Sequence, residues 1–353
     1  MKALMDMRRE ELAALIRELG QPAFRAGQVR EWLLRGARPA DMTNLPKALR
    51  DELAKLPWGG AEIYKKYVSA QDGTVKYLFS LDDGNLVEGV LMRYHHGNTL
   101  CLSTQVGCRM GCAFCASTLG GRVRDLTPGE MLGMAAAAER DEPKPESGRA
   151  VTNIVLMGSG EPLDNYDNVI EFLRRATDAD GLGISPRNIS LSTCGLVPMM
   201  RRLPEEAPHV TLCVSLHAHS DETRSEIMPV NRVYPIIEVL SAAREYANKT
   251  GRRVIFEYAL IEGKNDSRGD AAALASRLRG INCHVNLIPL NRVTERDLRG
   301  ASRARAAQFA AWLNEYGISA TVRREMGADI EGACGQLRRR VLEEERKDEP
   351  GGE

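Results

Sequence analysis

The sequence predicts an α/β fold, a partial parallel (β/α)6 barrel that follows an N-terminal helical domain and a small antiparallel β segment. Three observations support this prediction. Apolar residues recur at helical spacing over residues 1–57, and residues 61–104 hold short apolar runs separated by turn signals such as Asp72-Gly73. Further along the chain, short apolar strands alternate with longer amphipathic stretches, which is the pattern of parallel βα units.

The composition is that of a globular protein with a large core. Lys and Arg together number 48, as do Asp and Glu, in a chain of 353 residues. A net charge of zero excludes a polycationic nucleic-acid coat, so a phosphate-bearing partner would need a local basic patch. No apolar run approaches the roughly 18 to 20 residues of a membrane helix. We therefore expect a cytoplasmic protein with no membrane segment.

Four segments are expected along the chain. They are a helical accessory domain over residues 1–57, a small β lead-in over 58–93, the barrel over 94–328, and a C-terminal segment over 329–353 that ends in a charged tail. In the first segment, Leu12, Ile16 and Leu19 follow helical spacing and Gly20 marks an end.

The barrel segment contains six expected strands, each followed by a polar or glycine-rich turn. The strands are residues 100–104, 153–157, 188–192, 210–216, 254–260 and 284–288, with helices expected over 128–140, 168–176, 236–248, 271–278 and 304–315. An open dinucleotide-binding sheet would carry G-x-G-x-x-G at its first turn, and that motif is missing. The pattern therefore favours a barrel, in which the chemistry lies where the strands end.

Three cysteines follow the first barrel strand closely. Cys108, Cys112 and Cys115 have the spacing Cys-x3-Cys-x2-Cys, with glycines that allow the loop to curl. Zinc is the alternative metal for these cysteines. A structural zinc site needs four protein ligands, however, and no histidine occurs between His96 and His209. Three cysteines suit a four-iron cluster that leaves one iron open to a small molecule.

These cysteines, with the aromatic Phe114 just before the last of them, resemble the motif of the radical S-adenosylmethionine (SAM) superfamily. The resemblance implies that Cys108, Cys112 and Cys115 hold a [4Fe-4S] cluster whose open iron binds the amino and carboxylate groups of SAM. An electron from the cluster then cleaves SAM to a 5′-deoxyadenosyl radical. The superfamily also has a partial six-unit βα barrel, in agreement with the strand count.

The same resemblance implies SAM contacts at later strand ends. Gly160 and Glu161 lie in a Gly-Ser-Gly-Glu-Pro run that is similar to the superfamily's GEP segment, which meets the SAM amino group. The other cofactor-binding residues that it implies are Ser192, Ser215, Leu216, His217 and Asn291. Cys194 is assigned no role and is expected, with Cys213 and Cys283, to be a small buried apolar side chain.

Two further cysteines resemble those of the RlmN family of RNA methyltransferases. Cys101 lies seven residues before Cys108, and Cys334 lies in the run Gly-Ala-Asp-Ile-Glu-Gly-Ala-Cys-Gly-Gln-Leu. The resemblance covers nearly the whole chain and includes residues 87–92 and 228–231. It implies methylation of C2 of adenosine in large-subunit (23S) ribosomal RNA and in the transfer RNA anticodon loop.

The chemistry explains why such cysteines are needed. The C2 carbon of adenine lies between two electron-withdrawing nitrogens, so it is a poor nucleophile, whereas a carbon radical can add to it. By resemblance, Cys334 takes a methyl group from one SAM, and a second SAM generates the radical that activates this group. Glu88 matches the base that removes the C2 proton. Cys101 then attacks the Cys334 sulfur, which releases the RNA and leaves a transient Cys101–Cys334 disulfide.

The expected partners are ribosomal and transfer RNA, whose loop bases can be unstacked, and a low-potential electron donor such as flavodoxin. A monomer is expected. Two alternatives stay open. One is a C8 adenosine methyltransferase of the same family, which shares the cluster and both extra cysteines. The other is a non-catalytic iron-sulfur RNA-binding or redox-sensor protein, against which Glu161, Cys101 and Cys334 argue, because a sensor needs neither a SAM site nor a second cysteine pair.

Overall fold

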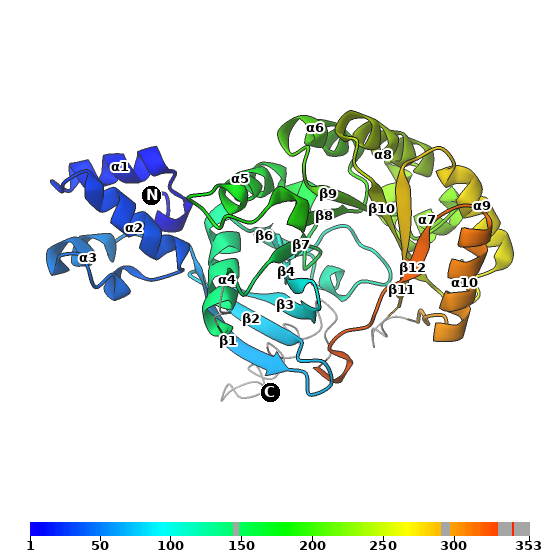
Figure 1. Cartoon of the computed structure of the whole chain (residues 1–353), viewed down its shortest axis with the longest axis horizontal. Helices are drawn as coiled ribbons and strands as arrows, with labels where there is room; N and C mark the ends of the chain where they lie inside the picture. Colours follow the sequence, from blue (N-terminus) through cyan, green and yellow to red (C-terminus); the bar gives the residue numbers. More distant parts are fainter. Residues whose placement is uncertain (144–147, 291–296, 331–340, 342–353) are drawn as a thin grey trace, which may run out of the picture.

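The structure is a computed structural model that describes residues 1–143, 148–290, 297–330 and 341. Three helices form one end of an elongated molecule, and a curved sheet with helices on its outer side forms the rest (Figure 1). The expected site residues Asn291 and Cys334 lie outside the described residues.

The N-terminal helices are α1 (Arg9–Glu18), α2 (Phe24–Leu34) and α3 (Lys47–Leu53). They pack against one another through apolar positions such as Leu12 and Val29, which are buried as the helical spacing predicts. The short helix η1 (Leu4–Asp6) joins them to the barrel, because the Asp6 carboxylate accepts a hydrogen bond of 2.8 Å from the Gly129 backbone.

The β lead-in and the barrel form a single sheet. Antiparallel strands β1 (Ala61–Val68), β2 (Val75–Leu81) and β3 (Leu86–Tyr94) come first. Strand β4 (Gly97–Leu102) pairs antiparallel with β3 on one side and parallel with β7 (Asn153–Leu156) on the other. The small antiparallel segment is therefore continuous with the parallel strands.

The parallel part continues through β8 (Ile189–Thr193), β9 (Thr211–Ser215), β10 (Val254–Leu260) and β11 (Cys283–Pro289). Together with β4 and β7 these are the six strands that the sequence predicts, and the fold class is confirmed. A further parallel strand, β12 (Ala320–Val322), follows β11 and was not predicted, because three residues are too few to show a period. Within the described residues β1 and β12 do not pair, so the barrel is open.

Helices cover the outer face of the sheet (Figure 1). They are α4 (Pro128–Asp141), α5 (Tyr166–Thr177), α6 (Val197–Glu206), α7 (Asp221–Ile227), α8 (Ile236–Thr250), α9 (Arg268–Leu278) and α10 (Arg303–Glu315). Helix α4 begins with a capping box in which Thr127 accepts a hydrogen bond from the Glu130 backbone. None of the helices in the described part of the chain has both the length and the hydropathy of a membrane-spanning segment.

Strand alternation divides the side chains between two environments. On β4, Leu100 and Leu102 belong to the main hydrophobic core, whereas Cys101 lies on the opposite face and packs with Val90 and Met92. A separate pair of short strands, β5 (Gln105–Gly107) and β6 (Arg122–Asp125), lies on either side of the cysteine-rich loop. The fold thus places this loop directly after β4.

Candidate active site

A cavity of about 290 Å³ is lined by residues at and just beyond the carboxyl ends of the parallel strands. Its lining includes most of the residues that the sequence predicts to bind the cluster and SAM. These are Cys108, Cys112, Cys115, Gly160, Glu161, Ser192, Ser215 and His217. Leu216 does not line the cavity. It is completely buried, and its backbone N–H donates to the Glu257 carbonyl at 3.1 Å.

The cysteine loop is closed by the β5–β6 pair. Gly107 has a φ of 77°, and a Cβ there would lie 1.9 Å from the Gly121 carbonyl oxygen, so a side chain cannot be accommodated. The Cys108 backbone N–H donates to the same Gly121 oxygen at 3.0 Å. On the other side of the loop, the Ala113 N–H donates to the Ile227 carbonyl at the end of α7 at 2.8 Å. The loop is therefore held at both sides.

The environment of the cysteines fits a bound cluster. Burial raises the pKa of the Cys108 thiol to about 12, and burial also raises the pKa of Cys112. Buried thiols of this kind are neutral until a metal replaces the proton. Among the described residues no three or more His, Cys, Asp or Glu side chains are arranged to hold a single metal ion. A four-iron cluster takes one thiolate per iron, so its ligands stand farther apart than those of one ion.

Glu161 is a buried carboxylate at the cavity wall. Its two oxygens accept hydrogen bonds from the backbone N–H groups of Leu163, at 3.0 Å, and Cys194, at 2.7 Å. Burial raises its pKa, and these hydrogen bonds act in the opposite direction. The preceding Gly160 has a φ of 106°, and a Cβ there would lie 2.6 Å from the Gln105 side chain. The segment thus requires glycine before the carboxylate.

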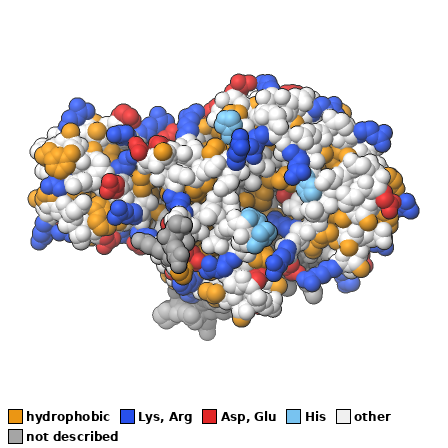
Figure 2. Space-filling view, in the orientation of Figure 1, with side chains coloured by type: hydrophobic (Ala, Val, Ile, Leu, Met, Phe, Trp, Pro, Cys, Tyr) orange, Lys and Arg blue, Asp and Glu red, His pale blue; other side chains and the backbone are white. Residues whose placement is uncertain are grey.

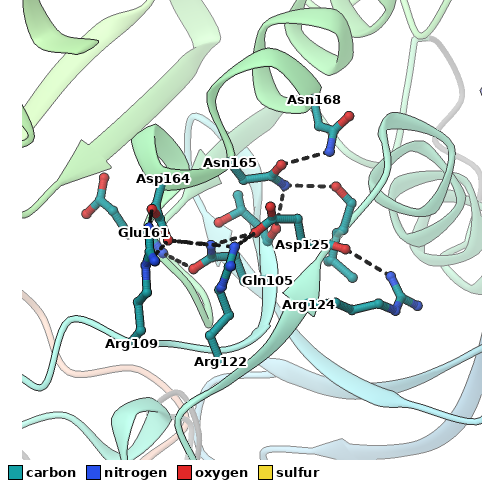
Figure 3. Close-up of polar contacts among 11 residues, drawn as sticks. Gln105, Arg109, Arg122, Arg124, Asp125, Glu161, Asp164, Asn165 and Asn168 are labelled. Atoms are coloured by element: carbon teal, nitrogen blue, oxygen red, sulfur yellow. Dashed lines mark hydrogen bonds and ion pairs between the residues drawn. The ribbon is translucent and has the colours of Figure 1, made fainter. Parts of the chain in front are cut away.

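A polar network joins the cysteine loop to the Glu161 segment (Figure 3). Gln105 accepts a hydrogen bond from the Glu161 N–H at 2.9 Å and donates to Asp164 at 3.0 Å. Arg109, which lies between the first two motif cysteines, donates from Nε to the same Asp164 carboxylate at 3.0 Å. The loop that carries the cysteines is therefore tied to the segment that carries Glu161.

His217 has an unusual backbone conformation at the end of β9. Its φ is 56°, in the left-handed region that non-glycine residues seldom adopt. The Ala259 N–H donates to its Nδ1 at 2.9 Å, and its ring packs edge-on against Phe114 with centroids 4.8 Å apart. Burial lowers the pKa of His217 to about 3, so the imidazole is neutral and its Nε2 carries the proton.

Cys101 lies beside this cavity on β4, and Glu88 lies on the neighbouring strand β3. Cys101 is buried on β4 and packs in one apolar group with Met157, which also lines the cavity. Glu88 on β3 is 3% exposed, and its Oε2 lies 3.3 Å from the Nζ of the fully buried Lys76 on β2. The structure thus places Glu88 in the interior, not at a solvent-facing position of a strand.

Residues on both sides of Cys334 pack against strand β3. Before it, Met326 packs with the apolar group of Cys101, and the Asp329 carboxylate accepts hydrogen bonds from the Ser69 hydroxyl at 2.6 Å and the Ala70 N–H at 2.9 Å. After it, Val341 is buried against Leu78 and Leu86.

Known proteins are similar to this chain over almost its whole length. Residues 102–275 match the radical SAM superfamily, and residues 2–57 match the ribosomal RNA large subunit methyltransferase N-terminal domain. A protein of Clostridium botulinum named "Probable dual-specificity RNA methyltransferase RlmN" is 49% identical over 348 residues, which cover 97% of this chain and 98% of that protein. The chain belongs to the RlmN family.

Further comparisons support the assignment to the RlmN family. A protein of the same name from Lachnoclostridium phytofermentans is 51% identical, with 94% of this chain and 92% of that protein covered. A radical SAM methyltransferase from Sphaerobacter thermophilus, known from a crystal structure, has 45% sequence identity to this chain. The two structures superpose with a TM-score of 0.89 over 95% of this chain and 99% of the other chain.

As a member of the RlmN family, the protein is a SAM-dependent RNA methyltransferase that uses a [4Fe-4S] cluster and SAM. Both expected cofactors, the enzyme class and RNA as the substrate are confirmed. The alternative of a non-catalytic iron-sulfur protein is wrong. The cluster, when bound, supplies the electron that cleaves SAM.

The structure adds cavity residues that the sequence analysis of this RlmN family member missed. Glu257 on β10 lines the cavity with 4% exposure and accepts a hydrogen bond from the Asn286 side chain at 3.0 Å. Burial raises the pKa of Glu257. The sequence feature that could have revealed this residue is that Glu257 is an acidic residue inside the otherwise apolar run of β10. Cys194, which received no role, lines the cavity too, whereas Cys213 is buried as expected and Cys283 is only partly buried.

The buried Lys76–Glu88 ion pair is expected to contribute to the free energy of unfolding of this protein. Lys76→Met is expected to lower the free energy of unfolding by about 3–5 kcal/mol, because a buried carboxylate loses its ammonium partner. The double variant Lys76→Met/Glu88→Leu should lose less, because no charge is then left behind. Urea unfolding followed by circular dichroism measures both. Equal losses in the two variants would contradict the importance of the pairing.

Proposed function

We propose that this RlmN family enzyme methylates C2 of adenosine in 23S ribosomal RNA and in the transfer RNA anticodon loop. The reaction proceeds through methylated Cys334 and a transient Cys101–Cys334 disulfide. The observation that carries the proposal is that Cys101 packs with Met157 of the cavity wall. Glu88 lies on the adjacent strand β3, against which residues on both sides of Cys334 pack. The relatives' name, a dual-specificity RNA methyltransferase, supports two RNA substrates.

Cofactor binding is assigned to residues of the cavity. In this proposal Cys108, Cys112 and Cys115 hold the cluster. The SAM contacts among the cavity residues are Gly160, Glu161, Ser192, Ser215 and His217. Leu216, which does not line the cavity, and Asn291, which lies outside the described residues, stay assigned to SAM by resemblance alone. Glu161 suits the SAM amino group because its oxygens are acceptors held by backbone N–H groups on a rigid loop. The neutral His217 presents an Nε2 donor without adding charge.

The later steps are assigned to Cys334, Glu88 and Cys101. Cys334 carries the methyl group that is joined to the adenine. Glu88 accepts the C2 proton, and its contact with Lys76 holds the carboxylate in place. Cys101 then attacks the Cys334 sulfur, so the sulfur–carbon bond to the methylated base breaks and a disulfide forms. Reduction of this disulfide restores the enzyme for the next turnover.

The surface is compatible with RNA despite the net charge of zero. Lys and Arg side chains are spread over the N-terminal helices and around the middle of the barrel on the face shown in Figure 2, with Asp and Glu between them. Local positive groups of this kind can contact phosphates without a strongly positive overall field. The cytoplasmic location, a donor such as flavodoxin and the monomeric state stay predictions.

The position of methylation separates the proposal from the C8 alternative. Purified enzyme with SAM, a reductant and RNA is expected to give 2-methyladenosine in both ribosomal and transfer RNA. Digestion to nucleosides and comparison with 2-methyladenosine and 8-methyladenosine standards by mass spectrometry measures this. Cys101→Ala, which lacks the thiol that releases the product, is the matched control and should give almost none. A dominant 8-methyl product would assign the enzyme to the C8 alternative.

A further inference from the structure

Arg224 on α7 is an arginine with no exposed surface. All five N–H groups of its guanidinium donate to uncharged oxygen atoms. Nε donates to Leu216 O at 3.1 Å, Nη1 to Asn231 Oδ1 at 3.0 Å and Tyr234 O at 3.4 Å, and Nη2 to Cys194 O at 2.6 Å and Ser215 O at 3.1 Å. The hydrogen-bonding capacity of the side chain is therefore fully used.

The positive charge of Arg224 is not matched by a carboxylate. No Asp or Glu of the described residues forms an ion pair with it. Asp221, the acidic residue one turn earlier on α7, has its carboxylate oxygen bound to the Ile236 N–H at 2.8 Å. A charge removed from water costs free energy unless an opposite charge compensates it. Hydrogen bonds to neutral carbonyls satisfy the donors but do not compensate the charge, and Asp221 attracts it without forming an ion pair.

The surroundings of Arg224 lead to the cysteine loop. Cys194 and Ser215, whose carbonyls it binds, line the cofactor cavity, so the guanidinium lies directly behind the cavity wall. Cys112 and Cys194 pack in the same apolar group. The guanidinium charge therefore lies close enough to the cysteine loop to attract a negatively charged group bound there.

We propose that Arg224 is the counter-charge of the iron-sulfur cluster, which it makes easier to reduce. The inference rests on the proposed binding of the cluster by Cys108, Cys112 and Cys115. Three thiolates bring negative charge into this loop, and one-electron reduction of the cluster adds one more negative charge. A fixed cation in a water-poor environment attracts the reduced cluster more strongly than the oxidised one. Arg224 thereby raises the reduction potential.

A purely structural role would have different consequences. Arg224 also ties together the ends of β8 and β9 through Cys194 and Ser215, so its loss would disturb the cavity wall in any case. Such a disturbance depends on the planar fork of five donors and not on charge. Variants that separate charge from shape distinguish the two roles.

The test uses the full chain, reconstituted with iron and sulfide without oxygen, and measures iron per chain and the midpoint potential of the cluster by spectroscopic titration. Arg224→Gln removes the charge, Arg224→Lys keeps it but loses the fork, and Asn231→Asp places a carboxylate against the guanidinium. We expect a more negative potential for Arg224→Gln and Asn231→Asp and a nearly unchanged potential for Arg224→Lys. Arg201→Gln, an exposed arginine on α6, is the control and should leave the potential unchanged.

Each outcome decides the matter. Wild-type potentials in iron-loaded Arg224→Gln and Asn231→Asp would overturn the proposal, as would an equal shift in Arg224→Gln and Arg224→Lys. If the two charge-altering variants lose the cluster while Arg224→Lys retains it, the charge is needed for binding itself and the proposal stands. Loss in all three variants would point to structure alone. A wild-type protein without iron would contradict the cluster assignment, not the role of Arg224 within it.

Discussion

Replacement of any one of Cys108, Cys112 and Cys115 by alanine is expected to remove the cluster and to abolish RNA methylation. The wild-type protein, reconstituted without oxygen, should hold about four irons per chain and absorb as an iron-sulfur protein. Each variant loses one of three ligands, and no described His, Asp or Glu forms a metal site with the remaining two. Iron content and absorption spectra measure the effect.

A matched control comes from Cys283→Ala. Cys283 begins β11, is partly buried and does not line the cavity, so this variant should keep its irons and its activity. The three loop variants should also keep the overall fold, because strands β5 and β6 hold the loop through backbone hydrogen bonds. Bound zinc without iron in the wild-type protein would contradict the cluster assignment.

Cys101→Ala is expected to stall the enzyme as a covalent complex with RNA. The methylated Cys334 can still be joined to adenine, but the thiol that attacks its sulfur is missing, so the product cannot leave. Cys334→Ala should form no complex, because nothing carries the methyl group to the base. Denaturing gels with labelled RNA separate the free and the attached RNA.

The double variant Cys101→Ala/Cys334→Ala is the control for this experiment and should form no covalent complex. Cys213→Ala removes a buried cysteine from β9 that has no proposed role, so its product should be released as in the wild type. Equal amounts of covalent complex in Cys101→Ala and Cys334→Ala would contradict the assigned roles.

The cluster loop could be predicted because its residues are contiguous. The spacing of Cys108, Cys112 and Cys115 is a property of eight consecutive residues, and the structure places all three at one cavity. Strand β10 was predicted with its observed bounds, Val254–Leu260, because most of its side chains are buried and apolar. Helix α7 and strand β12 were missed, since seven and three residues are too short for a clear period. Helix α6 was missed as well, because it contains Pro204, a residue that disfavours the interior of a helix.

The sequence by itself therefore determined the parallel βα architecture, the cysteine loop and the glycines that precede Glu161. Only the tertiary structure decided contacts between distant residues. Glu88 meets Lys76 because of the β2–β3 register, in which Leu78 stands opposite Glu88, and a shift of one residue would turn the carboxylate to the other face. Arg224 lies behind the cavity because the ends of β8 and β9 converge on it. Such contacts depend on how separate segments pack, which local residue patterns do not specify.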